Sequence, residues 1–186
     1  MLDAPGLIFD LRGYPNGTAW PIAPWLTERE VVTARFRALE RHGPDPDAYS
    51  ERHFRQRARP RPEGRYRGKV VVLIDEEAIS QSEHTCLFLE AAGGATFVGG
   101  PTNGANGDVT AVVLPGGVSV GFSGQEVTHA DGRQLQRVGI QPHLRVEPTI
   151  TGVRAGRDEV LEAAVGFLRD QAGGAPRQQP PRGDTP

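Results

Sequence analysis

The 186-residue sequence has one cysteine, Cys86, and one lysine, Lys69. A single cysteine excludes an intrachain disulfide framework and a zinc site built from several cysteines. The longest apolar runs, such as Val70–Ile74, are too short to cross a bilayer. Because the other 20 basic residues are all arginines, a mechanism that needs a lysine has to use Lys69.

Length and composition predict one globular domain, since 37% of the residues are apolar and 24% are charged. The formal net charge of −2 gives no overall attraction to nucleic acid or to anionic lipid. The N-terminus has no basic start and no extended apolar stretch before Asp10, so it does not resemble a signal peptide. Met1 is followed almost at once by a core-type strand, and we therefore expect further sequence upstream of it.

Hydrophobic patterning predicts an α/β fold with buried strands, over residues 1–170. A capping-box pattern at 27–30, with Val32, Phe36 and Leu39 at helical spacing behind it, predicts a helix. Residues 42–65 are rich in arginine and proline and are expected to form an irregular surface excursion, and residues 171–186 a disordered tail. The remaining expected elements are strands at 6–11, 69–74, 95–98, 125–128 and 143–146, helices at 80–92 and 157–169, and a hairpin of 109–114 with 118–122.

Ser80 lies where the strand at 69–74 gives way to a helix. A serine hydroxyl becomes a nucleophile when a base removes its proton, and the resulting oxyanion needs preorganised N–H donors. The first N–H groups of a helix, such as that of Gln81, are free to serve as donors. The alternative is that the Ser80 hydroxyl simply caps the helix.

A series of short blocks in fixed order resembles one family, the C-terminal-processing, or tail-specific, serine proteases. Residues 6–17, GLIFDLRGYPNG, resemble that family's G-L-I-x-D-L-R-x-N-x-G-G strand and loop. The blocks that follow, in the family's order, are 66–75 (YRGKVVVLID), 78–83 (AISQSE, similar to S-A-S-A-S-E), 98–102 (VGGPT), 131–133 (DGR) with Gln136, and 139–143 (GIQPH). Each block is loose alone, but the ordered series is specific and covers most of residues 6–147.

The resemblance implies the C-terminal part of a ClpP/crotonase-like peptidase domain, with Ser80 as nucleophile. It implies that the N–H groups of Gly17 and Gln81 form the oxyanion hole, that the substrate is a peptide or protein, and that no cofactor is needed. Ser82 and Glu83 are expected to cap and stabilise the start of the helix. Because the family is mostly found in the cell envelope, we expect the parent protein to be extracytoplasmic; the resemblance leaves open whether it is a homo-oligomer.

One departure from the family pattern concerns the general base. The common branch has a lysine in a T-F-G-K run, and here that run reads Thr102-Asn103-Gly104-Ala105. Lys69 opens a strand that extends several residues, at roughly 3.3 Å each, before Ser80 is reached, so it cannot substitute. The sequence is nearer to the tricorn-like branch, whose base is an upstream histidine assisted by a glutamate that Gln136 replaces here.

Local histidines offer weaker alternatives for the base. His84 lies four residues after Ser80, on the same helix face and within reach through a water, although a histidine at this place is expected to be solvated. His42 and His53 are expected to face solvent. No histidine pair has metal-binding spacing, and we therefore expect no metal.

Three hypotheses on function remain. The first is a serine peptidase acting through an acyl-enzyme on Ser80, with little activity in the isolated chain because the base is missing from it. In the second, catalysis has been lost and the domain binds a ligand or peptide. The third is nucleic-acid binding by the seven arginines between Arg52 and Arg67; the alternative, which the overall charge favours, is that they form a solvated surface. We expect no nucleic-acid partner and no membrane insertion.

Overall fold

The computed structural model describes residues 2–45 and 47–173. Its strands are β1 (Gly6–Asp10), β2 (Val31–Arg41), β3 (Tyr49–Ala58), β4 (Lys69–Ile74), β5 (Thr96–Gly99), β6 (Val109–Val113), β7 (Ser119–Ser123), β8 (Gln125–His129) and β9 (Leu144–Arg145). Its helices are α1 (Ala19–Ile22), a 3-10 turn (Ala23–Trp25), α2 (Gln81–Gly93), α3 (Ile150–Arg154) and α4 (Glu159–Gly173).

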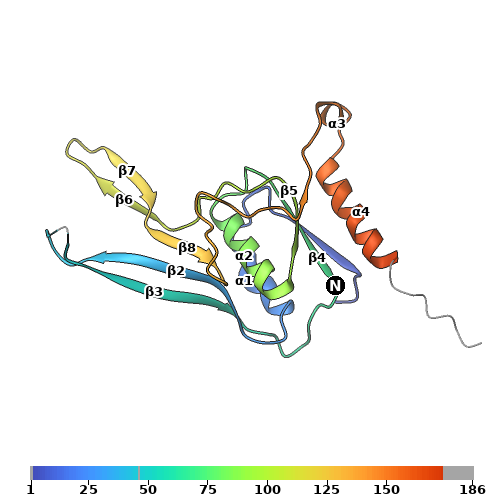
Figure 1. The fold of residues 1–186 in the computed structure, drawn as a ribbon, viewed down its shortest axis with the longest axis horizontal. Coiled ribbons are helices and arrows are strands. Elements are labelled where there is room, and N and C mark those ends of the chain that lie inside the picture. Colours follow the sequence, from blue (N-terminus) through green and yellow to red (C-terminus); the bar gives the residue numbers. More distant parts are fainter. Residues whose placement is uncertain (1, 46, 174–186) are drawn as a thin grey trace, which may run out of the picture.

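A parallel sheet in the order β1-β4-β5-β9 forms the centre of the fold. β4 is buried on both faces because its apolar residues are continuous rather than alternating. Val70, Val72 and Ile74 belong to the core that contains α2, while Val71 and Leu73 pack with Val160 and Ala164 of α4. The parallel sheet with helices on its two faces confirms the predicted α/β class (Figure 1).

Helix α2 lies between the parallel sheet and a second, antiparallel sheet of order β3-β2-β8. It has no solvent-exposed face over most of its length, since residues 82–89 are all buried. Gly94, in the left-handed conformation, ends it by donating its N–H to the carbonyl of Glu90. Ser80 immediately precedes this buried helix, so its position is fixed by the core of the domain.

The predicted helix over 27–39 is wrong, and so is the irregular excursion over 42–65 for residues 49–58, because β2 and β3 form a long antiparallel hairpin. In β2, buried Ala34, Phe36 and Ala38 alternate with exposed Arg35 and Arg37. This period of two is the signature of a half-buried strand, and the capping box with three apolar residues at helical spacing obscured it.

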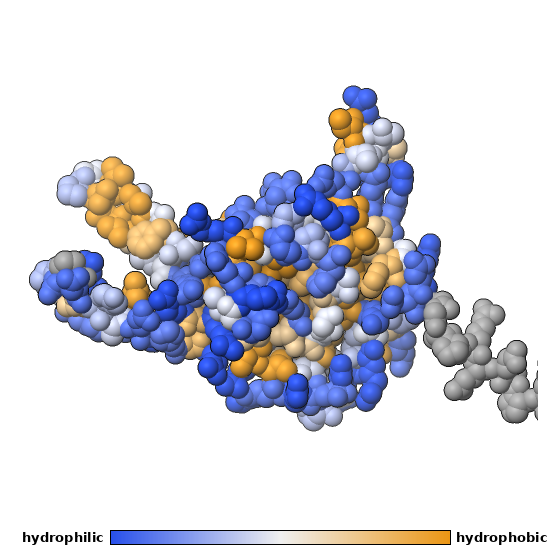
Figure 2. All heavy atoms as spheres, viewed as in Figure 1, coloured by the Kyte–Doolittle hydropathy of each residue, from blue (hydrophilic) through white to orange (hydrophobic). Residues whose placement is uncertain are grey.

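The predicted hairpin of β6 and β7 is present, and it projects from the body beside the β2–β3 hairpin (Figure 1). Every residue of both strands is exposed. The hairpin is apolar, with Val109, Val113, Val118 and Phe122 among its exposed side chains, and Figure 2 shows this apolar surface on the projecting arm.

The C-terminal prediction is only partly covered by the described residues. Helix α4 continues to Gly173, so residues 171–173 are helical rather than part of a tail, and the rest of the predicted tail lies outside the described residues. Over the described residues, no helix is both long and apolar enough to cross a membrane.

Candidate functional site

Ser80 occupies a strained backbone conformation in the turn between β4 and α2. Its φ of 53° and ψ of −109° lie outside the regions that residues with a Cβ ordinarily occupy. Although Ser80 stands at the N-cap of α2, its hydroxyl makes no capping hydrogen bond. The structure therefore does not support the capping alternative, and the hydroxyl is free to act on something else.

Hydrogen bonds from neighbouring segments hold this turn. The N–H of Asn103 donates to the carbonyl of Ala78 at 3.1 Å, and Ala78 itself is fully buried. The carbonyl of Ser80 accepts from the N–H of His84 at 2.9 Å, which starts the helical ladder. The N–H of Gln81, the first residue of α2, finds no acceptor within the described residues, as is usual at a helix start.

Glu83 stands in the first turn of α2 as predicted, but the side chains of Ser82 and Glu83 do not cap the helix and reach other segments instead. The fully buried Glu83 carboxylate accepts from the Thr102 hydroxyl at 2.5 Å and from the N–H groups of Gly104 and Ala105 at 2.6 and 2.9 Å. The Ser82 hydroxyl donates to the carbonyl of Gly13 at 2.8 Å. These contacts fix the loop after β5 and the loop after β1 around Ser80.

Gly17 and Gln81 lie side by side, but their contact differs from the expected one. The N–H of Gly17 donates to the side-chain Oε1 of Gln81 at 3.0 Å. Gly17 has a φ of +83°, a conformation that disfavours any residue with a side chain. The Gly17 N–H, which was predicted to stabilise an oxyanion, thus already donates to the carboxamide oxygen of Gln81.

A pocket of about 240 Å³ opens beside Ser80. It is formed by the segment after β1, the β2–β3 hairpin, the Ser80 turn with the start of α2, the loop that leads into β6, and the first residue of β8. Its lining residues are Tyr14, Trp20, Phe36, Phe54, Gln56, Ser80, Gln81, His84, Asn106, Gly107, Asp108 and Gln125. Of the predicted site residues, the pocket brings together Ser80, Gln81 and His84.

His84 is buried, so the prediction that it is solvated is wrong. Burial lowers the pKa of His84 to about 4, while the nearby Asp108 carboxylate opposes this shift. The ring is neutral at pH 7, with Nε2 bonded to the Gln56 side chain and Nδ1 3.4 Å from Nδ2 of Asn106. With both nitrogens engaged, His84 is not positioned to take the proton of Ser80.

Gln136 does not line the Ser80 pocket; it acts on the backbone nearby. Its Nε2 donates to the carbonyls of Asn106 at 2.5 Å and Gln125 at 2.7 Å, and its Oε1 accepts from the N–H of Val127 at 3.3 Å. A glutamate here could not donate to the two carbonyls, which is a physical reason for an amide at this position.

Other charged groups serve structure. Arg12 bonds Asp10 and Asp158, which joins the end of β1 to the start of α4 and holds the pKa of both carboxyl groups below the usual range. The buried His129 bonds Glu90 of α2 at 2.6 Å.

Lys69 is exposed at the first position of β4, so the six-residue strand separates it from the turn that carries Ser80.

The arginine-rich segment lies on β3 and the chain after it, and glutamates neutralise much of its charge. Glu30 pairs with Arg57 and Arg59, and Glu28 pairs with Arg65 and, at 3.9 Å, with Arg67. Arg52 pairs with Glu40. Five of the seven arginines therefore have a glutamate partner, which reduces the positive charge of this segment.

Sequence reasoning missed the residues that shape the pocket. Phe36, Phe54 and Gln56 lie on β2 and β3, which were predicted as a helix and an irregular segment. The alternation of Phe54, Gln56 and Ala58 with Arg55 and Arg57 is the signal that could have placed them on one face of a strand. Within residues 2–45 and 47–173, no group of three or more His, Cys, Asp or Glu side chains is arranged to hold a metal ion.

A family model described as Peptidase family S41 matches residues 2–146. The chain belongs to peptidase family S41. The ordered series of short blocks in the sequence therefore identified the family correctly.

The chain is also similar to solved structures and to a curated protein. A candidate peptidase from Parabacteroides merdae is 25% identical, with a TM-score of 0.74 over 89% of this chain and 52% of that one. Mature CPAF in complex with lactacystin has the same fold at 17% identity, with a TM-score of 0.69 over 90% of this chain and 45% of that one. A curated Chlamydia pneumoniae protein is 30% identical over 102 residues, which is 53% of this chain and 16% of that protein. The chain thus spans about half the length of these solved relatives.

Proposed function

We propose that this S41 chain supplies the nucleophile, the oxyanion donors and part of the substrate pocket of a serine peptidase. The observation that carries the proposal is the Ser80 turn, where a strained, uncapped serine precedes a buried helix and lines a pocket. Strain of this kind costs roughly 1–3 kcal/mol and persists at functional sites, where the surrounding structure enforces it.

In the proposed reaction, Oγ of Ser80 attacks the carbonyl carbon of a peptide bond as a base takes the hydroxyl proton. The N–H groups of Gln81 and Gly17 stabilise the oxyanion, after the Gln81 side chain has left Gly17. The proton passes to the leaving amine, and water then hydrolyses the acyl-enzyme.

The general base of this proposal comes from outside the described residues. His84 has both ring nitrogens engaged, and His129 is buried against Glu90. Lys69 stands at the far end of β4, roughly 16 Å of strand away from Ile74 at about 3.3 Å per residue. We therefore expect the chain alone to hydrolyse peptide bonds very slowly.

Labelling with a fluorophosphonate, with added imidazole as an external base, tests the proposal. We expect labelling of Ser80 in the folded chain at a rate that rises with imidazole concentration. Ser80→Ala should abolish the label, and Ser123→Ala, on the exposed strand β7, should retain it. A label on another serine, or none at any imidazole concentration, would contradict the assignment of the nucleophile.

A second candidate function is peptide binding without catalysis. The specific observation in its favour is that Gln81 occupies the Gly17 N–H at 3.0 Å, which competes with a substrate carbonyl. Saturable peptide binding together with the absence of Ser80 labelling would favour this candidate.

A further inference from the structure

The pocket beside Ser80 has a lining that is unusual for this arginine-rich chain. Four of its side chains are aromatic, and none of its lining residues is an arginine or a lysine. Asp108 is the one acidic side chain among the lining residues, and burial keeps His84 neutral at pH 7. The pocket therefore combines aromatic faces with a single negative charge.

The aromatic rings are held in fixed positions. Phe36 and Phe54 stack at a centroid distance of 4.5 Å with an interplanar angle of 5°, and the Trp20 and His84 rings are 5.6 Å apart. Tyr14 and Trp20 are exposed at the mouth of the pocket. Ring faces of this kind attract cations and pack against the methylene groups of long side chains.

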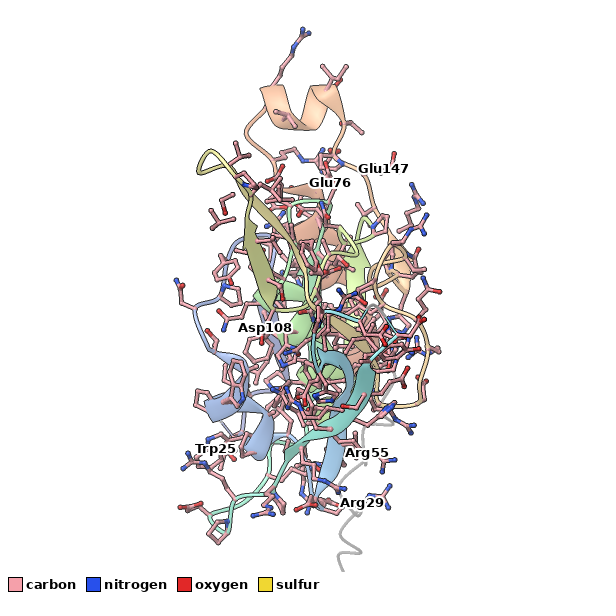
Figure 3. The ribbon with its side chains drawn as sticks, turned by 90° about the vertical axis from the view of Figure 1, so that its left-hand side faces the viewer. Trp25, Arg29, Arg55, Glu76, Asp108 and Glu147 are labelled. Atoms are coloured by element: carbon pink, nitrogen blue, oxygen red, sulfur yellow. The ribbon has the colours of Figure 1, made fainter. Side chains whose placement is uncertain are left out.

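Asp108 differs from the other carboxylates of this surface because it has no basic partner. Among the residues that the structure describes, no arginine or lysine nitrogen lies within 4.0 Å of it, whereas Glu28, Glu30 and Glu51 all pair with arginines. Its Oδ2 accepts from Nε2 of Gln125 at 3.1 Å, which orients the carboxylate. Figure 3 labels Asp108 where the chain enters the β6–β7 hairpin.

We propose that this pocket binds the side chain of an arginine or lysine in a peptide, with the methylene stem against the rings and the positive charge near Asp108. Its volume of about 240 Å³ lies below the roughly 300–1,000 Å³ of sites for larger ligands, so it suits one side chain. Because Ser80 also lines the pocket, the basic residue flanks the bond that is cleaved; this last step rests on the proposed function.

The test measures binding in the Ser80→Ala chain, which separates it from catalysis. The ligands are N-acetyl-arginine methylamide and N-acetyl-citrulline methylamide. The citrulline ligand has an uncharged urea group where the arginine ligand has its guanidinium. The indole N–H signals of Trp20, in the pocket, and Trp25, outside it, report binding by NMR. We expect only the Trp20 signal to shift, and the arginine ligand to bind at least threefold more tightly at low salt.

Variants that each remove one negative charge test whether Asp108 causes the preference for the arginine ligand. Asp108→Asn should remove the preference for arginine over citrulline, while Asp170→Asn, which removes the same charge on exposed α4, should leave it unchanged. Equal binding of the two ligands, or a preference that survives in Asp108→Asn, would overturn the proposal. Neither result bears on Ser80 as nucleophile, which the labelling experiment tests separately.

Discussion

At the scale of single residues, the Gln81 carboxamide is the contact that bears most directly on activity. Its Oε1 accepts a hydrogen bond from the N–H of Gly17, and a neutral hydrogen bond of this kind contributes about 0.5–1.5 kcal/mol of stabilisation. A developing oxyanion forms a stronger, charge-assisted bond to the same donor. Displacing Gln81 therefore costs the same single neutral bond in the ground state and in the transition state, and the transition state recovers more of that cost.

We predict that Gln81→Ala raises the rate of imidazole-assisted fluorophosphonate labelling of Ser80 by about 2- to 10-fold, the equivalent of that one bond. The rate is measured against Gln141→Ala, which removes an exposed carboxamide that does not line the pocket. A slower rate in Gln81→Ala would show instead that the side chain holds Gly17 in position.

His84 makes stability depend on pH. Its pKa is lowered to about 4 in the folded chain, against about 6.5 in the unfolded chain, because protonation would charge a buried ring. The unfolded state therefore binds more protons between these values, and stability is lost as the pH falls from about 6.5 toward 4. The groups that face the ring are Gln56, Asn106, aromatic side chains and, as the one charge, Asp108.

We predict that His84→Gln flattens the fall in free energy of unfolding between pH 6.5 and 4 by on the order of 3 kcal/mol. Urea unfolding of wild type and variant across this range gives the difference, in which the titration of all other groups cancels. His42→Gln, at an exposed position where the ring contacts the uncharged Ser50 hydroxyl, should keep the wild-type slope. An unchanged slope in His84→Gln would mean that the buried ring is not the titrating group.

At the scale of elements, the sequence predicted those whose patterns are local. The buried strand β4, helix α2 and the β6–β7 hairpin all lie close to their predicted ranges. The β2–β3 hairpin was missed because a capping box and three apolar residues at helical spacing obscured the period of two in β2. Because Phe36, Phe54 and Gln56 line the pocket from that hairpin, the Ser80 turn was predictable from the sequence and this side of the pocket was not.

The buried Glu83 carboxylate is the tie between α2 and the loop after β5. We predict that Glu83→Ala lowers the free energy of unfolding by at least about 2 kcal/mol, because the Thr102 hydroxyl and the Gly104 and Ala105 amides lose their acceptor. Urea unfolding measures this loss, and hydrogen exchange at the two amides should accelerate. Glu77→Ala, on the exposed part of the preceding turn, should be close to neutral; a similar loss in both variants would contradict the assigned role.

At the scale of the whole molecule, the arginines and glutamates form a mixed surface rather than a basic one. Exposed ion pairs of this kind add little stability, but they cancel the field that a polyanion would sense. This mixed charge lies along β2 and β3, and the apolar β6–β7 hairpin lies beside them (Figure 2).

We predict no salt-dependent binding of duplex DNA by the chain, measured by fluorescence anisotropy from low to physiological salt. Affinity that falls steeply and linearly with salt on a log–log scale would contradict this expectation. The double variant Glu28→Gln and Glu30→Gln releases the arginines that these residues neutralise, and it should bind measurably at low salt.

The Gln136 carboxamide has a consequence for how this molecule meets other chains. By bonding the carbonyl of Gln125 and the N–H of Val127, it satisfies main-chain groups at the outer edge of β8. A neighbouring strand would find these groups taken, which protects this edge from sheet-to-sheet aggregation. The opposite edge, β3, is guarded by charge instead, since Arg52, Arg55 and Arg57 stand along it. The antiparallel sheet is thus closed to unwanted partners by a side chain at one edge and by charge at the other.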